Sequence, residues 1–195
     1  MGTLLQQLLL AYHYRMKAPR RTAPLPEKID KLTRSIENAL TSESFPTQVR
    51  PLTLRQARQL VKADWQFDWA REATASDREV LQLNTVANPH IIHGLLSLEV
   101  LPDLVFMHLV ESAPFNKGRY KAYVGVLGNL TAFACRRSFE LGLDGYVAFD
   151  SKTKLVAHYK AVLEATQLTS TRLYLGTPAA QKLVDRYYPN PSAPY

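Results

Sequence analysis

Two glycines in the second half of the sequence stand three positions apart, where the sequence predicts that a loop passes into a helix. Gly125 and Gly128 are followed by Asn129, a suitable N-cap residue, and by an apolar helical pattern. A helix start offers backbone N–H groups without an intrahelical acceptor and a partial positive charge, so it binds phosphate without a cationic side chain. Glycine lets a phosphate approach the backbone and permits positive φ. The pattern predicts a phosphate-binding turn; the alternative is a helix start in which the glycines only shape the turn.

The remaining residues with catalytic or metal-binding potential do not form a recognised motif. Cys135 is the single cysteine, which excludes an internal disulfide and a cysteine-rich zinc site. No histidine and acid accompany it at the spacing of a cysteine nucleophile. His90, His93 and His108 lack a metal-ligand pattern such as HExxH, and no Walker loop or dinucleotide-binding GxGxxG is present. The sequence therefore predicts no metal site.

The glycine turn follows a centre that is rich in predicted strands. These strands cover residues 48–52, 79–86, 93–100 and 103–111. Pro102-Asp103 makes the last two an antiparallel hairpin. Residues 103–111 are apolar except for His108 and the terminal acids, which indicates a central strand covered on both faces. After a loop over 112–127, the pattern predicts a helix from about Gly128, a strand at 146–149, a helix at 152–163, a strand at 172–175 and a helix at 179–187.

The first third of the chain carries further helix signals. Thr53 and Gln56 have the spacing of a capping box and predict a helix that starts there. Trp65, Phe67 and Trp69 are interpreted as packing residues around a bend. A helix is also predicted over 26–40, because apolar residues recur at helical spacing and a proline suits the first turn: Pro26, Ile29, Leu32, Ile36 and Leu40.

This order of elements resembles the GNAT superfamily of acyl-coenzyme A-dependent N-acyltransferases, with the chain as a divergent member. The resemblance covers roughly residues 48–188 and rests on two segments: Val110-Glu111 with the loop and 125–132, and Gly145–Phe149 with Lys152–Lys160. It implies an α+β fold, with a mixed, mostly antiparallel sheet flanked by helices and a short basic N-terminal extension. The expected domain limits are 1–25 for the extension and basic linker, 26–188 for the GNAT-like domain and 189–195 for a Pro-rich tail.

The resemblance implies transfer of an acyl group, most simply acetyl, from coenzyme A to an amine. Acetyl-CoA or another acyl-CoA would be the co-substrate, and no metal is implied. Glu111 takes the place of the general base, with His108 and Glu99 as alternatives, and Tyr159 that of the acid that protonates the thiolate. The implied cofactor-binding residues are Val110, Gly125, Val126, Gly128, Asn129, Leu130, Thr131 and Lys152.

Composition and charge leave a second function open. The 195 residues carry a net charge of +7, with cationic residues concentrated early: Arg15, Lys17, Arg20, Arg21, Lys28, Lys31 and Arg34. The alternative is therefore a GNAT-like acyl-CoA-binding or inactive module whose basic arm contacts nucleic acid or a protein partner. No apolar stretch has the length of a membrane span, and a cytoplasmic protein is expected. The acceptor and the oligomeric state are not determined by the sequence.

Overall fold

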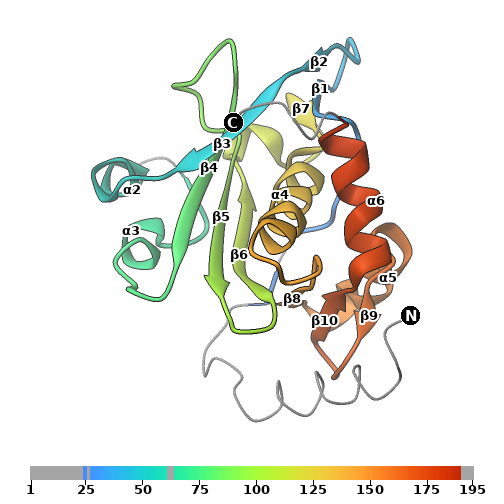
Figure 1. Ribbon diagram of the computed structural model, residues 1–195. Coiled ribbons are helices and arrows are strands. Elements are labelled where there is room, and N and C mark those ends of the chain that lie inside the picture. The colour runs from blue at the N-terminus through green and yellow to red at the C-terminus, as the bar shows by residue number, and fades with distance from the viewer. Residues whose placement is uncertain (1–23, 26, 61–63, 190–195) are drawn as a thin grey trace.

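The computed structural model describes residues 24–25, 27–60 and 64–189. Most of the predicted extension, including a helix expected at 3–16, and nearly all of the predicted tail lie outside these residues. A seven-stranded sheet with the order β3-β4-β5-β6-β8-β10-β9 forms the centre (Figure 1), and a small sheet has the order β2-β1-β7. The strands of the large sheet are β3 (Thr47–Pro51), β4 (Glu79–Thr85), β5 (Gly94–Val100), β6 (Val105–Ser112), β8 (Val147–Asp150), β9 (Thr166–Gln167) and β10 (Arg172–Leu175). Those of the small sheet are β1 (Ile36–Asn38), β2 (Ser44–Phe45) and β7 (Tyr123–Val124).

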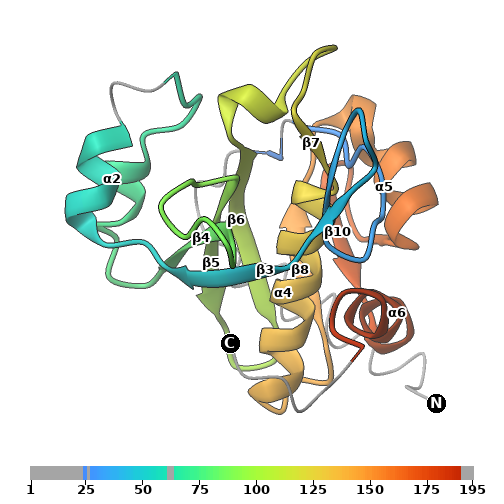
Figure 2. The ribbon, with the colours of Figure 1, turned by 90° about the horizontal axis from the view of Figure 1, so that it is seen from above.

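Helices cover both faces of the large sheet (Figure 2). One face carries α4 (Val126–Glu140), α5 (Val156–Leu163) and α6 (Thr177–Tyr187), and the other carries α2 (Leu54–Leu60) and α3 (Trp69–Glu72). Two 3₁₀ turns are η1 (Pro114–Asn116) and η2 (Thr153–Leu155). None of the helices in the described residues combines the length and the hydropathy needed to cross a bilayer. The predicted α+β class, with a mostly antiparallel sheet flanked by helices, is confirmed.

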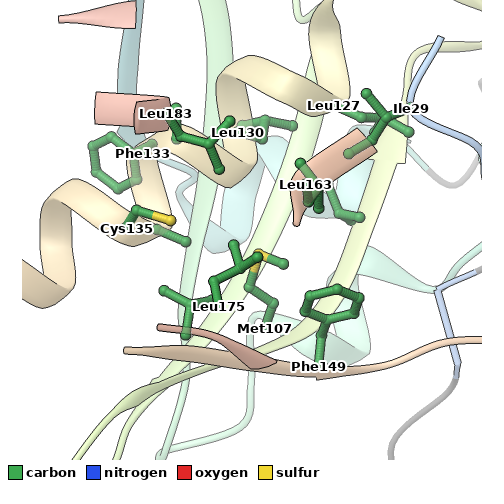
Figure 3. Packing of buried hydrophobic residues seen from close by; sticks show 14 of the residues in the cluster. Ile29, Met107, Leu127, Leu130, Phe133, Cys135, Phe149, Leu163, Leu175 and Leu183 are labelled. Atoms are coloured by element: carbon green, nitrogen blue, oxygen red, sulfur yellow. The ribbon is translucent and has the colours of Figure 1, made fainter. Parts of the chain in front are cut away.

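The buried centre of the sheet is β6, as its apolar run predicted. Every residue of β6 is buried. Because successive side chains point to opposite faces, Leu109 joins the cluster under α2 and α3 while Val110 joins the larger cluster under α4. Figure 3 shows this larger cluster, in which Met107 lies near Phe149 and Leu175 below the helices. The predicted β5–β6 hairpin is also confirmed, with Gly94 opposite Ser112 and Val100 opposite Val105.

Two predictions in the first third are confirmed in atomic detail. The Thr53 N–H donates to Gln56 Oε1 at 3.0 Å, and the Gln56 N–H donates to Thr53 Oγ1 at 3.2 Å, which is a reciprocal capping box at the start of α2. Trp65 and Phe67 meet Trp69 edge-on, with ring centroids 6.5 and 6.4 Å apart. These aromatic residues pack together at the bend before α3, as the sequence indicated.

The helix predicted over 26–40 is wrong. The chain is irregular up to β1, and Leu25 forms a parallel bridge with Ser151. Ile29 and Ile36 are buried, but Leu40, which a helix would have placed on the same face, is 94% exposed. The apolar residues have helical spacing for a different reason. An extended chain buries Ile29 beside the helices and Ile36 in strand β1. Tertiary pairing of this segment with distant strands overrides the local pattern.

The start of α4 also differs from the prediction. The helix begins at Val126 rather than near Gly128, and Gly125 is its N-cap in a left-handed conformation with φ of 85°. Asn129 lies inside the helix and does not cap it; its Nδ2 donates to Thr47 Oγ1 at 2.8 Å. Leu141, the residue that follows the last residue of the helix, is 38% exposed. The left-handed glycine, rather than an N-cap side chain, sets the entry into this helix.

His93 predicts a pH-dependent stability. The ring is 2% exposed and meets Phe115 and Tyr123 edge-on at 5.6 and 4.8 Å, and burial lowers its pKa from 6.5 to about 4. The folded state therefore binds fewer protons, so the stability contributed by the neutral ring is complete above pH 6.5 and is lost as pH falls toward 4. We expect His93→Phe to remove about 3 kcal/mol of this pH-dependent loss. Urea unfolding of both proteins between pH 7 and 4.5 measures it, and equal slopes would contradict it.

Candidate functional site

The two parallel strands at the centre of the sheet pair over a short distance and then separate. β6 pairs with β8 from Val105–Val147 to Met107–Phe149, and β6 continues to Ser112 while β8 ends at Asp150. We call the region between the two strands beyond this pairing the wedge. The first turn of α4 and the side chain of Tyr159 from α5 contact the same chain segment that crosses it. The elements that carry the predicted site residues Val110, Gly125 and Tyr159 thus border the wedge.

A β-bulge in β6 marks the point where the two strands separate. Met107 pairs with Leu98 and Leu109 with Ser97, so His108 is an extra residue in β6. The bulge places His108 beside Phe106, with ring centroids 4.8 Å apart. His108 Nε2 lies 2.7 Å from Glu99 Oε2, which joins the two alternative bases in one pair. Burial lowers the pKa of His108, against the effect of Glu99.

Glu111 is fully buried, on the sheet face covered by α3. Its carboxylate accepts hydrogen bonds from Trp69 Nε1 at 2.7 Å and from Lys117 Nζ at 2.6 Å. It also accepts from the backbone N–H of Gln66 at 2.6 Å and of Phe67 at 3.4 Å. Glu111 therefore fixes the connection before α3 to the end of β6.

An acidic side chain lies at the start of α4, where the sequence predicted a phosphate. The Gly125 N–H donates to Asp30 Oδ1 at 3.1 Å, and Asp30 Oδ2 also pairs with Lys121 Nζ at 2.8 Å. A negative charge is stabilised at this end of a helix by the helix dipole and the unpaired N–H groups. In this structure the chain itself supplies a carboxylate at the helix start, and binding of a phosphate there stays a prediction.

Gly128, Leu130 and Thr131 have contacts within the fold, away from Asp30. A Cβ on Gly128 would lie 2.3 Å from Tyr187 Oη, so this glycine lets α6 approach α4. Leu130 is fully buried in the main cluster, and Thr131 Oγ1 donates to the Leu127 carbonyl one turn earlier. The Asn129 N–H donates to the Gly125 carbonyl. An anion at this end is therefore reached by the backbone N–H groups of residues 125–128 rather than by those further along.

Tyr159 and Lys152 lie on the other side of the wedge. The Tyr159 ring is 2% exposed, and its hydroxyl donates to the Glu27 carbonyl. Burial raises its pKa, and the nearby Glu27 charge adds to this, so the phenol stays protonated. The Lys152 N–H lies 3.5 Å from the Leu25 carbonyl. Val110, from β6, is 2% exposed and completes the set of predicted residues around the wedge.

Three charged residues of this site were not predicted from the sequence. Lys117 Nζ lies 3.2 Å from Glu27 Oε1 and 2.6 Å from Glu111 Oε1, so it joins the two carboxylates around the end of β6. Asp30 is the third. Glu27 and Asp30 are three positions apart in the segment that was predicted as helix, and the sequence assigned them no role. No local signal reveals them, because their partners lie more than 80 residues away.

Comparison with known proteins gives similarity at the level of the fold. No family model matches the sequence, and no curated protein matches it. Among solved structures, AtaTR bound with AcCoA has a TM-score of 0.49 at 13% identity, covering 71% of this chain and 98% of AtaTR. A spermidine N-acetyltransferase SpeG chimera from Vibrio cholerae and hSSAT has 0.47 at 13%, covering 70% and 98%. The ribosomal-protein-S18-alanine N-acetyltransferase from Escherichia coli has 0.42 at 11%, covering 76% and 99%.

The TM-scores of these three neighbours lie between 0.42 and 0.49. Two of the three are N-acetyltransferases by name, and the third holds acetyl-CoA. At these identities the similarity describes the fold and does not carry an activity over to this chain.

The Gly128 contact predicts coupling between α4 and α6. We expect Gly128→Ala to destabilise the fold by about 2 kcal/mol, because the added Cβ would overlap the Tyr187 hydroxyl. In a Tyr187→Phe background the same change should cost less, because the nearest atom is gone. A double-mutant cycle of urea unfolding measures this coupling. Additive effects of the two substitutions would show that Gly128 does not set the distance between the helices.

The four hydrogen bonds to the Glu111 carboxylate predict a large loss of folding stability when its charge is removed. Glu111→Gln would turn amide N–H groups toward donors, leaving buried groups unsatisfied, and we expect a loss of about 3 kcal/mol in the free energy of unfolding. Glu79→Gln is the matched control, since it breaks an exposed ion pair with Arg137 and should cost less than about 1 kcal/mol. Equal and small losses in both variants would argue against the anchoring contacts.

Proposed function

We propose that this protein is a divergent GNAT-like enzyme that transfers an acyl group, most simply acetyl, from coenzyme A to an amine. One observation carries the proposal: the end of β6, the N-terminus of α4 and the Tyr159 hydroxyl converge on the wedge, where two parallel strands separate. A thioester of coenzyme A needs an anion site for its pyrophosphate, N–H donors for its carbonyl and an acid for its leaving thiolate. In this proposal the start of α4, the backbone near Val110 and the Tyr159 hydroxyl would supply them.

The proposed cofactor contacts are largely made by the backbone. The N–H groups of Gly125, Val126 and Gly128 would hold the pyrophosphate at the positive end of α4. N–H groups near Val110, at the end of β6, would polarise the thioester carbonyl. Lys152, at the end of β8, would add a cation beside the phosphates. Asn129, Leu130 and Thr131 would support these contacts by fixing the helix against the core.

Two proton transfers complete the proposed reaction. Tyr159 would donate a proton to the coenzyme A thiolate, and its raised pKa keeps that proton in place until the thiolate forms. An ammonium acceptor must lose a proton before it attacks the thioester. Glu111 is the proposed base, and the pair of His108 and Glu99 is the alternative, since both lie on the sheet face opposite α4.

A hollow on the same sheet face suits the acceptor. It has a volume of about 680 Å³ and lies beside α2. Gln82, in its lining, pairs across the sheet with Leu95, which pairs with Glu111, so the three form one row. Arg50 and His90 also line it, together with further glutamines. This lining favours a polar acceptor that carries a carboxylate near its amine.

A second candidate function follows from the position of Asp30 at the start of α4. A GNAT-like module that holds no coenzyme A would also place its own acid at the α4 N-terminus, as Asp30 is placed here. Its function would then rest on the basic residues, of which Lys28, Lys31 and Arg34 are among the described residues and are exposed. Salt-dependent retention on a DNA or RNA matrix would favour this candidate.

Calorimetric titration with acetyl-CoA separates the two candidates. The enzyme proposal expects saturable binding and, with an amine acceptor, release of the free thiol. Absence of binding at millimolar acetyl-CoA, in the wild type and in the variants described below that open the wedge, would overturn it.

The Tyr159 hydroxyl predicts a defect in turnover. Tyr159→Phe retains the ring and its packing against Phe149, so acetyl-CoA affinity should hold, while the rate of acyl transfer should fall by roughly 10²–10⁴-fold. Tyr120→Phe is the matched control, because that ring is 89% exposed. Steady-state kinetics separate kcat from KM. An unchanged kcat in Tyr159→Phe would leave this tyrosine with a packing role only.

A further inference from the structure

The wedge is filled by a segment from the start of the described chain, Leu25 with residues 27–33, which we call the strap. It begins at the end of β8, where the Leu25 N–H donates to the Asp150 carbonyl at 2.7 Å and Leu25 bridges Ser151. The Ser151 N–H itself points the other way, to Thr171 at 2.8 Å. Leu25 thus pairs with the edge of β8 that β6 has left. The strap takes up the backbone groups that the separation of the two strands exposes.

The next contacts of the strap are with β6 and α5. Glu27 Oε2 accepts from the Ser112 N–H at 3.4 Å, and the Glu27 carbonyl accepts from the Tyr159 hydroxyl. Glu27 Oε1 lies 3.2 Å from Lys117 Nζ. Glu27 alone therefore accepts hydrogen bonds from the end of β6 and from Tyr159, the proposed proton donor.

Its far end covers the start of α4. Ile29 is buried beside Leu127 of α4 and Leu163 of α5 (Figure 3), and Asp30 accepts from the Gly125 N–H. The Thr33 N–H donates to Tyr187 Oη at 3.0 Å, which fixes the strap to α6. The strap runs from the end of β8 to the N-terminus of α4.

From these contacts we propose that the strap is an intramolecular occupant of the acyl-CoA site, which withdraws when acyl-CoA binds. The inference rests on the proposed function. The strap and a coenzyme A thioester would compete for the same donors: the Gly125 N–H, which Asp30 holds in place of a phosphate, the Tyr159 hydroxyl, and the Ser112 N–H at the end of β6. Both cannot be bound together.

The strap carries features of a reversible contact. Burial raises the pKa of the Glu27 carboxyl, against the favourable effect of Lys117, so the docked strap disfavours the ionised form. Docking is therefore weaker at neutral pH than at acidic pH. The groups that face Glu27 are Lys117, Ser112 and Tyr159. Apart from Leu25, Ile29 and Leu32, the strap makes its contacts mainly through polar groups.

Substitutions in the strap test this proposal on the full chain. Ile29→Ser removes the buried side chain, and Lys28→Ser is the matched control on a neighbouring exposed residue. We expect the acetyl-CoA dissociation constant to fall about tenfold in Ile29→Ser, because more of the protein has an open wedge, and to stay unchanged in Lys28→Ser. Asp30→Asn should act in the same direction and keeps the test available if Ile29→Ser does not fold.

Amide hydrogen exchange gives a readout that does not require binding. In the wild type, acetyl-CoA should increase exchange in residues 27–33 and keep Gly125 and Ser112 protected. If acetyl-CoA binds while exchange in 27–33 and the affinity of the strap variants stay unchanged, the strap proposal is overturned and acyl transfer stands. If Ile29→Ser raises exchange at Gly125 and Ser112 without ligand, yet no variant binds acetyl-CoA, the acyl-transfer proposal is overturned and occupancy of the wedge by the strap is supported.

Discussion

The separation of β6 from β8 is the constraint on which the rest of this structure depends. Two parallel strands in the middle of a sheet expose backbone N–H and C=O groups wherever they stop pairing, and such groups must find partners when buried. At the end of β8 the partner is Leu25, and at the end of β6 it is the Glu27 carboxylate. Two uses of the wedge follow from the same need: it binds the chain itself, or it binds a ligand that offers similar acceptors.

One cation links the two faces of the sheet at this point. Lys117 contacts Glu27 on the side of α4 and Glu111 on the side of α3. Glu111 in turn holds the N–H groups that precede α3. Docking of the strap and the position of the connection before α3 therefore share a single charged group. In the proposed reaction this connects the thioester side of the sheet with the acceptor side.

The sequence predicted those parts of the fold whose signals are local. The capping box of Thr53 and Gln56 and the apolar run of β6 need only neighbouring residues, and both are confirmed. The helix at 26–40 failed because its apolar spacing also fits a chain that buries Ile29 and Ile36 in separate places. Of the site, the glycines predicted a turn into α4, and Gly125 does precede that helix with positive φ. The occupant was not, because the contacts of Asp30 and Glu27 join residues that are remote in sequence.

The bond from Thr33 to Tyr187 spans 154 positions, and the bridge from Leu25 reaches residue 151. During synthesis, the ribosome releases the strap long before β8, α5 and α6 exist, so the strap has no place to dock until nearly all of the described chain has been made. Contacts between residues so far apart in sequence close large loops and form slowly. The sheet and its helices are therefore expected to assemble around an open wedge. Every newly made molecule would pass through a state in which that site is accessible before its own chain reaches it.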